Sequence, residues 1–380
     1  MSVTCVPIRD LSAEDVQRWN DWAAPHGHLI SPYFLPDFAL AVDDVRGDVE
    51  VAVIREGDQV TGYFAHHAVR GGTIRPVGAP MSDYQGIVAA PGANIDMDRV
   101  LSACGACALL YDNWHDTYVP AAMPRRDRGG SVICDLEKGP DAYFDTQRGL
   151  YRDHFRKLDR RQRKAEATFG PMRVVIGDPS GLHFHTLAAW KSAQYRSTGK
   201  LDVLGVPWAR KLLRNLGKQE GSPFGTLTAA LYFGDHLAAV EVGLKAGGIY
   251  HSWFPAYDPA FSKFSPGLLL IHAIIQASDA HGISRVDLGR EGAQYKKYYT
   301  SWEVPLESGR ALAPGLASFA IRGWETAELC AKVLPGSMGE LPARARRRWS
   351  QVSAFEPDLA TRFATFARSL KAEPGTTNAA

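Results

Sequence analysis

Residues His236–Tyr299 read HLAAVEVGLKAGGIYHSWFPAYDPAFSKFSPGLLLIHAIIQASDAHGISRVDLGREGAQYKKYY. Alternating apolar and polar residues on both sides of a Gly-Gly turn predict a two-stranded hairpin. A helix is expected over 266–280, followed by a short strand around VDLG and a short helix around YKKYY. Ser265 precedes Pro266, a residue typical of a first helical turn. Because a helix start presents backbone N–H groups, this junction is a candidate anion site.

The composition is that of a globular protein with room for large cores. The chain has 380 residues, of which 45% are hydrophobic and 22% charged, and its net charge is +2. This length predicts one to three domains. The sequence has neither a signal-peptide pattern nor an apolar run long enough for a membrane span. Five cysteines do not indicate a disulfide framework, so we expect a cytoplasmic protein, with attachment to the inner-membrane surface as a further option.

The order of predicted elements is repeated along the chain. A hairpin over 49–69, a helix over 97–106 and a strand over 109–114 precede a second series that begins with a hairpin and ends at VDLG. We interpret the pattern as two α/β domains of similar topology with mixed sheets. The expected division is an N-terminal domain over 1–145, a basic connecting helix over 146–170, a C-terminal domain over 171–310 and a helical tail with an arginine cluster over 311–380.

Three polar residues of this stretch are candidate general bases. Glu241 interrupts the apolar strand AAVEVGL, where burial would raise its pKa, although a carboxylate paired with an arginine is an equal alternative. His251 lies in the second strand, where a core histidine with a satisfied hydrogen bond is the simpler interpretation. Asp287 ends a strand, a common place for catalytic side chains and also for a loop brace. Pro255 is expected to interrupt the strand ladder, because it lacks an N–H.

The segment resembles a known family of transferases. The order strand, strand, strand, helix, strand, helix is the core of the Gcn5-related N-acetyltransferase (GNAT) fold. The stretches YRDHFRKLDRRQRKAEATFG, WKSAQYRSTG, FPAYDPAFSKFSPGLLL and VDLGREGAQYKKYY resemble the cellulose-biosynthesis and capsule-type acetyltransferases, with the holdfast and exopolysaccharide branches nearest. This resemblance covers residues 30–305. It extends more distantly to the Fem peptidyltransferases, which also pair two such domains.

The resemblance implies an acyltransferase that uses acetyl-CoA or another acyl-CoA. Its acceptor would be an amino sugar or sugar precursor of an envelope or extracellular polysaccharide. The pantetheine chain would pair with the strand expected to end at Phe254, and the pyrophosphate would lie near Lys263, Ser265 and Gly267, which replace the usual Gly-rich loop. Tyr295 matches the position of the acid that protonates the leaving thiolate.

Other residues are predicted to bind the sugar. Asp83 and Tyr84 lie in a loop that resembles the acceptor-facing loop of the family, with a surface turn as the alternative. An aromatic residue with amide and basic groups suits a sugar ring or a sugar phosphate, although the tryptophan could equally belong to the core. The candidates on the second half of the chain are Trp190, Gln194, Tyr195, Arg290, Glu291 and Lys296.

Charged and cysteine-containing motifs leave further options. Arg344 and Arg348 follow an R-x-x-x-R spacing seen in cyclic di-guanylate receptors, and an anionic membrane surface or a solvated helix start are the alternatives. RNA is not expected at the basic helix, because no base-stacking aromatic motif accompanies it. Cys104 and Cys107 form a lone CxxC with no second ligand pair at zinc spacing, so no metal is expected.

Two rival functions remain. One is a Fem-like transfer of an aminoacyl group from tRNA to a cell-wall precursor. The other is a non-catalytic, regulatory protein that binds a nucleotide through its basic clusters.

Overall fold

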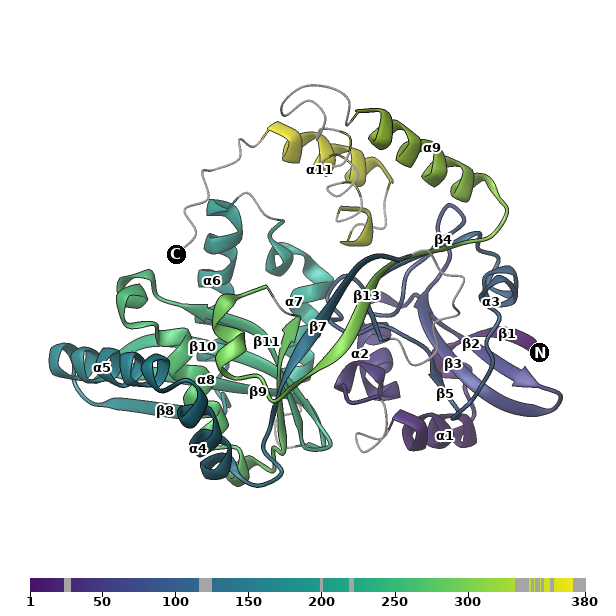
Figure 1. The fold of residues 1–380 in the computed structure, drawn as a ribbon. Coiled ribbons are helices and arrows are strands. Elements are labelled where there is room, and N and C mark those ends of the chain that lie inside the picture. The colour runs from purple at the N-terminus through teal and green to yellow at the C-terminus, as the bar shows by residue number, and fades with distance from the viewer. Residues whose placement is uncertain are drawn as a thin grey trace.

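The computed structural model describes residues 1–23, 29–115, 125–198, 201–218, 222–290 and 292–331. Towards the C-terminus it describes residues 342, 345, 349, 352–355 and 359–371. The described chain forms two α/β halves that lie side by side, with the C-terminal helices across the top of the view (Figure 1).

The C-terminal half follows the order expected from the sequence. Its elements are β8 (Met172–Ile176), α6 (Leu182–Ser197), α7 (Pro207–Gly217), β9 (Phe224–Phe233), β10 (His236–Ala246), β11 (Ile249–Tyr257), α8 (Pro266–Gln276) and β12 (Arg285–Arg290). Strands β8 to β11 pair antiparallel in chain order, and β12 lies parallel to β11. Helix α8 makes the crossover that a parallel pair requires.

The N-terminal half has the same order of helices and strands. Its elements are β1 (Ser2–Pro7), α1 (Ala13–Ala23), α2 (Pro36–Arg46), β2 (Val49–Glu56), β3 (Gln59–His67), β4 (Thr73–Ile74), β5 (Val88–Ala89), α3 (Met97–Ala103), β6 (Ala108–His115) and β7 (Arg125–Asp135). A four-stranded sheet has the order β1-β2-β3-β5. The repeated order supports the expected pair of similar α/β folds.

Exchanged strands join the halves into one nine-stranded sheet. Its order is β4-β6-β13-β7-β12-β11-β10-β9-β8, where β13 is Trp302–Leu312. Strand β13 of the second half lies between β6 and β7 of the first half, and β7 pairs with β12. These two long strands run through the centre of the molecule in Figure 1. Because of this exchange, residues that are far apart in the sequence lie close together where β7, β12 and β13 meet.

Helices cover both faces of the sheet in the C-terminal half. On one face α6 and α7 share a core with α1, α2 and the N-terminal sheet, which ties the halves together. On the other face α8 packs with α4 (Pro140–Leu150) and α5 (Arg152–Phe169). A third core lies under α3.

Two local expectations were wrong. The basic segment over 146–170 is two helices, because the chain breaks at Tyr151 between α4 and α5. Pro255 does not end its strand: β11 continues to Tyr257, and Pro255 pairs in register with Glu241. A proline is tolerated here because β11 has lost β12 as a neighbour by this point, so its missing N–H faces an edge. The expected limits at 145 and 310 fall inside α4 and β13, and the division into domains stays a prediction.

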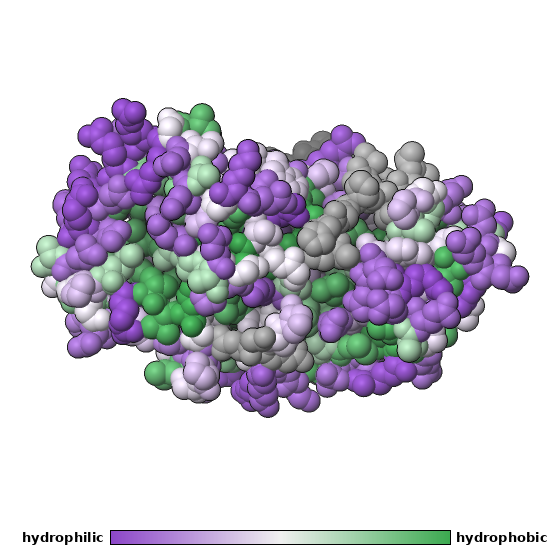
Figure 2. Space-filling model, turned by 90° about the horizontal axis from the view of Figure 1, so that it is seen from below, coloured by the Kyte–Doolittle hydropathy of each residue, from purple (hydrophilic) through white to green (hydrophobic). Residues whose placement is uncertain are grey.

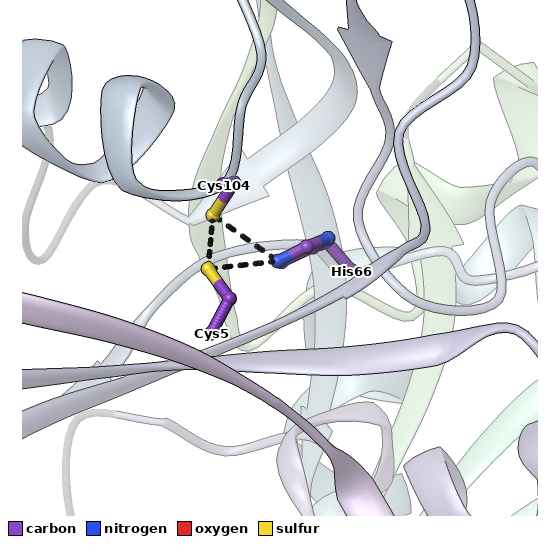
Figure 3. Close-up of side chains that lie close together, drawn as sticks. All are labelled: Cys5, His66 and Cys104. Carbon is purple, nitrogen blue, oxygen red and sulfur yellow. Dashed lines mark hydrogen bonds between the residues drawn. The ribbon is translucent and has the colours of Figure 1, made fainter.

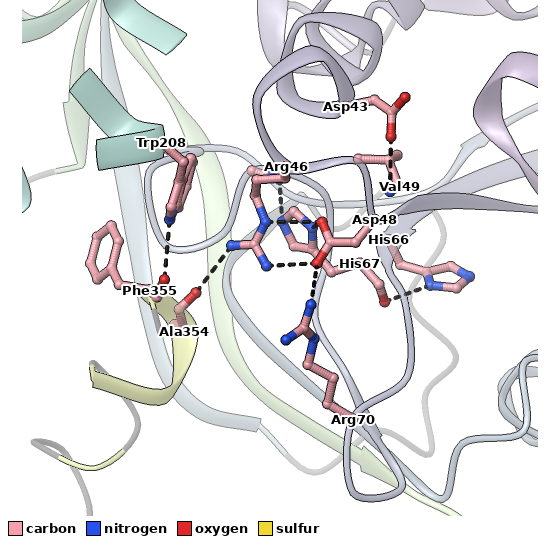
Figure 4. Close-up of polar contacts among 11 residues, drawn as sticks. Asp43, Arg46, Asp48, Val49, His66, His67, Arg70, Trp208, Ala354 and Phe355 are labelled. Carbon is pink, nitrogen blue, oxygen red and sulfur yellow. Dashed lines mark hydrogen bonds and ion pairs between the residues drawn. The ribbon is translucent and has the colours of Figure 1, made fainter. Parts of the chain in front are cut away.

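The C-terminal segment packs where the two halves meet. Beyond α9 (Leu316–Ala331), the Arg46 guanidinium donates to the Ala354 carbonyl and the Trp208 indole donates to the Phe355 carbonyl, at 3.4 and 3.2 Å (Figure 4). Arg46 also pairs with Asp48, which binds His67 and Arg70 as well. The segment 352–355 therefore bridges α2 and α7. Helix α11 (Leu359–Lys371) follows.

One face of the surface and the described helices bear on membrane insertion. On the face seen in Figure 2, hydrophilic residues surround separate apolar patches. Among the described residues, no helix combines the length and apolarity needed to cross a bilayer.

Candidate active site

The parallel pair β11–β12 opens into a fork at His251. The two strands pair at Ile249–Arg285, Tyr250–Val286 and His251–Asp287, and then diverge. Beyond the fork, β11 bulges at Trp253, because Val242 opposes Phe254 whereas Gly243 opposes Ser252. The bulge directs the Trp253 indole to the Met81 carbonyl, 2.9 Å away. A loop of the N-terminal half is thereby held at the fork.

This loop completes a chain of three polar side chains. His251 Nε2 lies 2.9 Å from Asp83 Oδ2, and His251 Nδ1 lies 3.1 Å from Asp287 Oδ2. The side chains of His251 and Asp287 are 0% exposed, whereas that of Asp83 is 38% exposed. The sequence made His251 and Asp287 alternative candidate bases and Asp83 a candidate sugar contact, whereas the structure joins the three in one unit. Asp83 is its solvent-facing end.

The electrostatics of this unit favour a charged imidazole. Burial lowers the pKa of His251, but the carboxylates of Asp287 and Asp83 outweigh it and raise that pKa to about 10. Burial would raise the pKa of Asp287, and the charge of His251 with donors such as Ser131 brings it below the usual value. At neutral pH His251 is therefore an imidazolium, which donates a hydrogen bond from Nε2 to Asp83 and forms an ion pair with Asp287 on its Nδ1 side. It is not a free base.

Backbone and hydroxyl donors hold the inner carboxylate. Ser131 Oγ donates to Asp287 Oδ1 at 2.7 Å, and the Gly289 amide donates to the same oxygen at 2.8 Å. Gly289 has φ +76°, a left-handed conformation that turns its N–H back and that glycine adopts without strain. Asp287 is thus fixed from three sides, which orients the imidazole in turn.

Aromatic rings shield the imidazole from water. The rings of Tyr33 and Tyr84 meet the ring of His251 edge-on, with centroids 5.2 and 6.0 Å away. Both tyrosines are buried, and burial raises the pKa of each well above its ordinary value. Tyr84 was expected at the substrate. It lies instead in the wall beside the histidine.

The segment after β12 folds back over the fork. The short helix η7 (Gln294–Tyr298) carries Tyr295 and Lys296, which are both half-buried. Lys296 Nζ donates to the carbonyls of Gly289 and Arg290, at 3.2 and 2.6 Å. Burial lowers the pKa of Lys296, and burial together with the charge of Glu241 raises the pKa of Tyr295 to about 12. Tyr295 therefore keeps its proton at neutral pH.

Glu241 lies inside the sheet and does not face the opening. It is 1% exposed and accepts a hydrogen bond from the Tyr250 hydroxyl at 3.1 Å. The Tyr250 ring covers Gly243, where a Cβ would stand 2.1 Å from its Cζ atom. Burial raises the pKa of Glu241, as the sequence predicted. The alternative was a carboxylate paired with an arginine, and in the structure the hydroxyl of Tyr250 is bonded to Glu241 instead.

Helix α6 forms one wall beside the open end of β11. Lys191 Nζ donates to the Pro255 carbonyl at 2.9 Å. Tyr195 is half-buried, and burial, followed by the charges of Asp83 and Asp202, raises its pKa to about 12. The charge of Asp83 therefore reaches Tyr195, whereas Gln194 is exposed and Trp190 packs against the shared core. Of the three predicted sugar contacts, Tyr195 is the one near the fork.

The start of α8 is open and positively flanked. Ser265 is left-handed, with φ +57°, and among the described residues its side chain caps no backbone amide. Arg161 of α5 instead donates to Ser265 Oγ at 2.7 Å. A Cβ built on Gly267 would meet no described atom within 4 Å. Lys263 is exposed in η5 (Pro259–Phe264), and Phe254 lies in β11 beyond the fork.

A separate cavity of about 990 Å³ lies between β6, β13 and the C-terminal helices. Arg290 lines it and donates to Asn113 Oδ1 and Ser308 Oγ, at 3.1 and 3.0 Å. Its wall also contains Arg46, Arg70, Arg75, Arg310 and Arg362. Glu291, Arg344 and Arg348 lie outside the described residues, so their predicted roles stay predictions.

Several residues of the site were not singled out from the sequence, and Ser131 and Arg161 are two of them. Ser131 is a small polar residue within the apolar run SVIC of β7, and only the strand exchange places it beside Asp287. Arg161 is one of several basic residues of α5, and the sequence alone does not separate it from its neighbours. The polar residue Ser131 directly before the apolar residues Val132 and Ile133 was the one available signal.

Comparison with known proteins supports this architecture. Residues 152–297 match the acetyltransferase (GNAT) domain family. No curated protein matches the sequence. A conserved protein of unknown function from Bacteroides thetaiotaomicron is similar at 11% identity, with a TM-score of 0.50, over 80% of this chain and 98% of that chain.

Two further solved structures are similar. The C-terminal domain of a candidate lysylphosphatidylglycerol synthetase from Agrobacterium fabrum matches at 14% identity and a TM-score of 0.48, over 82% of this chain and 95% of that one. A tandem GNAT protein of clavulanic acid biosynthesis matches at 11% identity and a TM-score of 0.44, over 83% and 99%. At these identities the likeness concerns the fold.

The described architecture and the family match confirm the fold class expected from the sequence, a tandem pair of mixed-sheet GNAT-like units with a helical tail. The region similar to the acetyltransferase (GNAT) domain family runs from α5 to η7.

Proposed function

We propose that this protein transfers an acyl group from a CoA thioester to the amine of a sugar that is built into an envelope or extracellular polysaccharide. The observation that carries the proposal is the unit Asp83–His251–Asp287 at the fork of β11 and β12. In this unit a buried imidazolium holds a carboxylate that can accept a proton. The open edge of β11 and the start of α8 lie in the same half of the protein, and together they can bind the acyl-CoA donor.

The donor lies along the C-terminal half. The edge of β11 beyond His251 has lost β12 as a partner, so its amide groups can pair with the pantetheine chain around Phe254. The pyrophosphate rests on the first turn of α8 at Ser265 and Gly267, where the helix dipole favours an anion. Arg161, with the exposed Lys263 nearby in sequence, adds positive charge. This combination favours a phosphate-bearing donor.

Asp83 accepts the proton of the attacking amine. It is the exposed member of its unit, whereas Glu241 is enclosed and His251 already carries a proton. The amine nitrogen forms a bond to the thioester carbonyl carbon, the carbon–sulfur bond breaks, and the amine proton passes to Asp83. His251 and Asp287 keep the Asp83 carboxylate in place, so they act as positioning residues.

Tyr295 returns a proton to the leaving group. Its raised pKa keeps the phenol protonated until the CoA thiolate forms, and the thiolate then takes that proton. Lys296, held over the Gly289 and Arg290 carbonyls, provides the nearby positive charge that stabilises the developing oxyanion or thiolate.

The acceptor approaches from the side of α6 and the Asp83 loop. Tyr195 and the exposed Gln194 provide an aromatic face and an amide for a sugar ring, with Trp190 behind them. The choice of an amino sugar and of a polysaccharide pathway rests on the resemblance to cellulose- and holdfast-type acetyltransferases.

The test is an acetyl-transfer assay on the full chain with a panel of amino sugars and nucleotide-linked amino sugars. We expect acetyl-CoA to raise the melting temperature, and mass spectrometry to detect an acceptor 42 Da heavier, the mass of an acetyl group that replaces a proton. Absence of a thermal shift at saturating acetyl-CoA would overturn the donor assignment. Transfer that requires charged tRNA instead would establish the aminoacyl alternative.

A further inference from the structure

Three side chains of the N-terminal half meet far from the fork. Cys5 lies in β1, His66 in β3, and Cys104 is the residue that ends α3. Figure 3 shows the three groups pointing at one another. Their ligand atoms all lie within 4.8 Å of one another, and His66 and Cys104 are buried while Cys5 is half-buried. Nothing in the proposed transfer reaction uses them.

The tautomer of His66 is set by its surroundings. His66 Nδ1 lies 3.0 Å from the carbonyl oxygen of His67, so it carries the hydrogen and donates it (Figure 4). The lone pair of Nε2 then faces the two sulfurs, 3.3 Å from Cys104 Sγ and 4.0 Å from Cys5 Sγ. A backbone carbonyl that fixes the second nitrogen is the usual support of a metal-binding histidine.

The two sulfurs are closer than two independent thiols pack. They stand 2.7 Å apart, and either a covalent bond between them or a cation bound by both would relieve this contact. A disulfide would involve only the two cysteines and would not account for the orientation of the His66 imidazole. A cation can be bound by all three side chains. Glu50 lies opposite His66 in the β2–β3 register, and its charge acts on both sulfurs, so a carboxylate is at hand for a fourth position.

We propose that Cys5, His66 and Cys104 bind a zinc ion that joins β1, β3 and α3. Two thiolates and one imidazole suit zinc in particular, because it accepts sulfur and nitrogen ligands in a tetrahedral arrangement. Two sulfurs bound to one tetrahedral zinc stand about 3.8 Å apart, so they must separate by about 1 Å. Strand β1 is the edge strand of its sheet, which allows Cys5 to make this movement.

The role of this ion is structural. It ties the first strand of the chain to the end of a seven-residue helix, across 99 residues of sequence. A bound metal adds its binding free energy to folding, because the unfolded chain does not preform the site. The CxxC motif concealed the site, since only Cys104 of that pair takes part and its partners come from distant strands.

Metal content of the full chain tests the proposal. The protein is produced with added zinc, dialysed without chelator and analysed by elemental mass spectrometry. We expect about one zinc per chain, lost in Cys104→Ser and in His66→Asn. Cys107→Ser is the matched control, because Cys107 lies three residues further on and its thiol meets the Gly72 carbonyl instead. The control must keep its zinc.

A second measurement covers variants that fail to fold. In the wild-type chain, cobalt in place of zinc should give a thiolate-to-metal absorption band, and a chelator should lower the melting temperature until zinc is added back. A zinc-free wild-type protein without a cobalt band would overturn the proposal. So would a Cys5–Cys104 disulfide found by alkylation and mass spectrometry in protein purified with zinc.

Discussion

The two halves place a helix at the same point of the same element order, yet its first turn differs. In the N-terminal half α3 is capped by Asp96, whose carboxylate accepts from the amides of Asp98 and Arg99 at 3.0 and 3.3 Å. In the C-terminal half α8 begins at Ser265 without such a cap, and Arg161 stands beside it. A carboxylate therefore caps the start of α3, whereas the start of α8 has no such cap among the described residues.

The strands that precede α3 and α8 also differ, in their length. Strand β5 has two residues, whereas β11 has nine and extends beyond its parallel partner. The N-terminal half therefore lacks both the long open edge and the free helix start, within the part of the chain that the structure describes. It contributes Asp83 to the shared site instead. Repetition of a fold does not require repetition of its ligand site.

The substitution with the largest expected effect, Asp83→Asn, tests whether the N-terminal half supplies the general base. Asp83→Asn should lower kcat/KM about 10²- to 10⁴-fold, because the amide cannot accept the amine proton. Acetyl-CoA binding should change little, whereas the melting temperature should fall, because the buried imidazolium of His251 loses one of its two carboxylate partners. Asp58→Asn, in the exposed β2–β3 turn, is the matched control. If Asp83→Asn retains near-normal turnover, the halves do not share a site in the proposed way.

Tyr295→Phe tests the acid on the C-terminal side. We expect kcat to fall by about 10²-fold with little change in donor affinity, since the phenol acts only when the thiolate leaves. Tyr298→Phe serves as the control, because the Tyr298 ring stacks on His154 with centroids 3.9 Å apart. Equal effects of the two substitutions would point to packing and remove the acid role.

A pair of substitutions at matching helix positions tests the difference between α3 and α8. Gly267→Leu should weaken acetyl-CoA binding about tenfold or more, because the new side chain fills the space over the first turn of α8. Asp98→Leu, at the same position of α3, should leave donor affinity unchanged. Isothermal titration should give one donor per chain. A stoichiometry of two would show that the N-terminal half binds a donor after all.

The smallest expected effect is a pair of opposite pH dependences. The pKa of His251 is raised to about 10, so its stabilising contribution is complete below pH 6.5 and is lost as the pH rises toward 10. Burial lowers the pKa of His67 to about 4, so the stability from its neutral form is present above pH 6.5 and is lost as the pH falls toward 4. Thermal unfolding from pH 4 to 10 measures both.

The matching variants separate the two histidines. His251→Gln should flatten the alkaline limb of the stability curve, and His67→Gln should flatten the acidic limb. A His251→Gln variant that loses stability at alkaline pH as steeply as the wild-type chain would show that the imidazole between Asp83 and Asp287 is neutral.

The comparison also explains which parts of the site could be predicted. The hairpin, α8 and β12 were found because their patterns are local: period-two alternation, a Gly-Gly turn and a Ser-Pro helix start. The same patterns singled out His251 and Asp287 as candidates. They treated the two residues as alternative bases and not as one unit, because neither strand's own sequence specifies the pairing of His251 with Asp287.

Long-range placement accounts for what was missed. Ser131 reaches Asp287 across 156 residues of sequence, and Asp83 reaches His251 across 168. Both contacts depend on the strand exchange and on the Trp253 bulge, which are products of packing. The expectation that Pro255 would end its strand was wrong for the same reason. Strand β12, whose pairing a proline would disturb, no longer pairs with β11 at that point.

By itself the sequence determined the order of elements, the repeat and the start of α8, where we propose that the donor binds, since these follow from propensities and hydrophobic periods over a few residues. The tertiary structure alone decided that an aspartate from the first half would meet a histidine of the second, and that Cys5, His66 and Cys104 would converge. Such contacts arise when separate surfaces bury their apolar faces together, and no local pattern specifies which polar groups that burial brings within 3 Å.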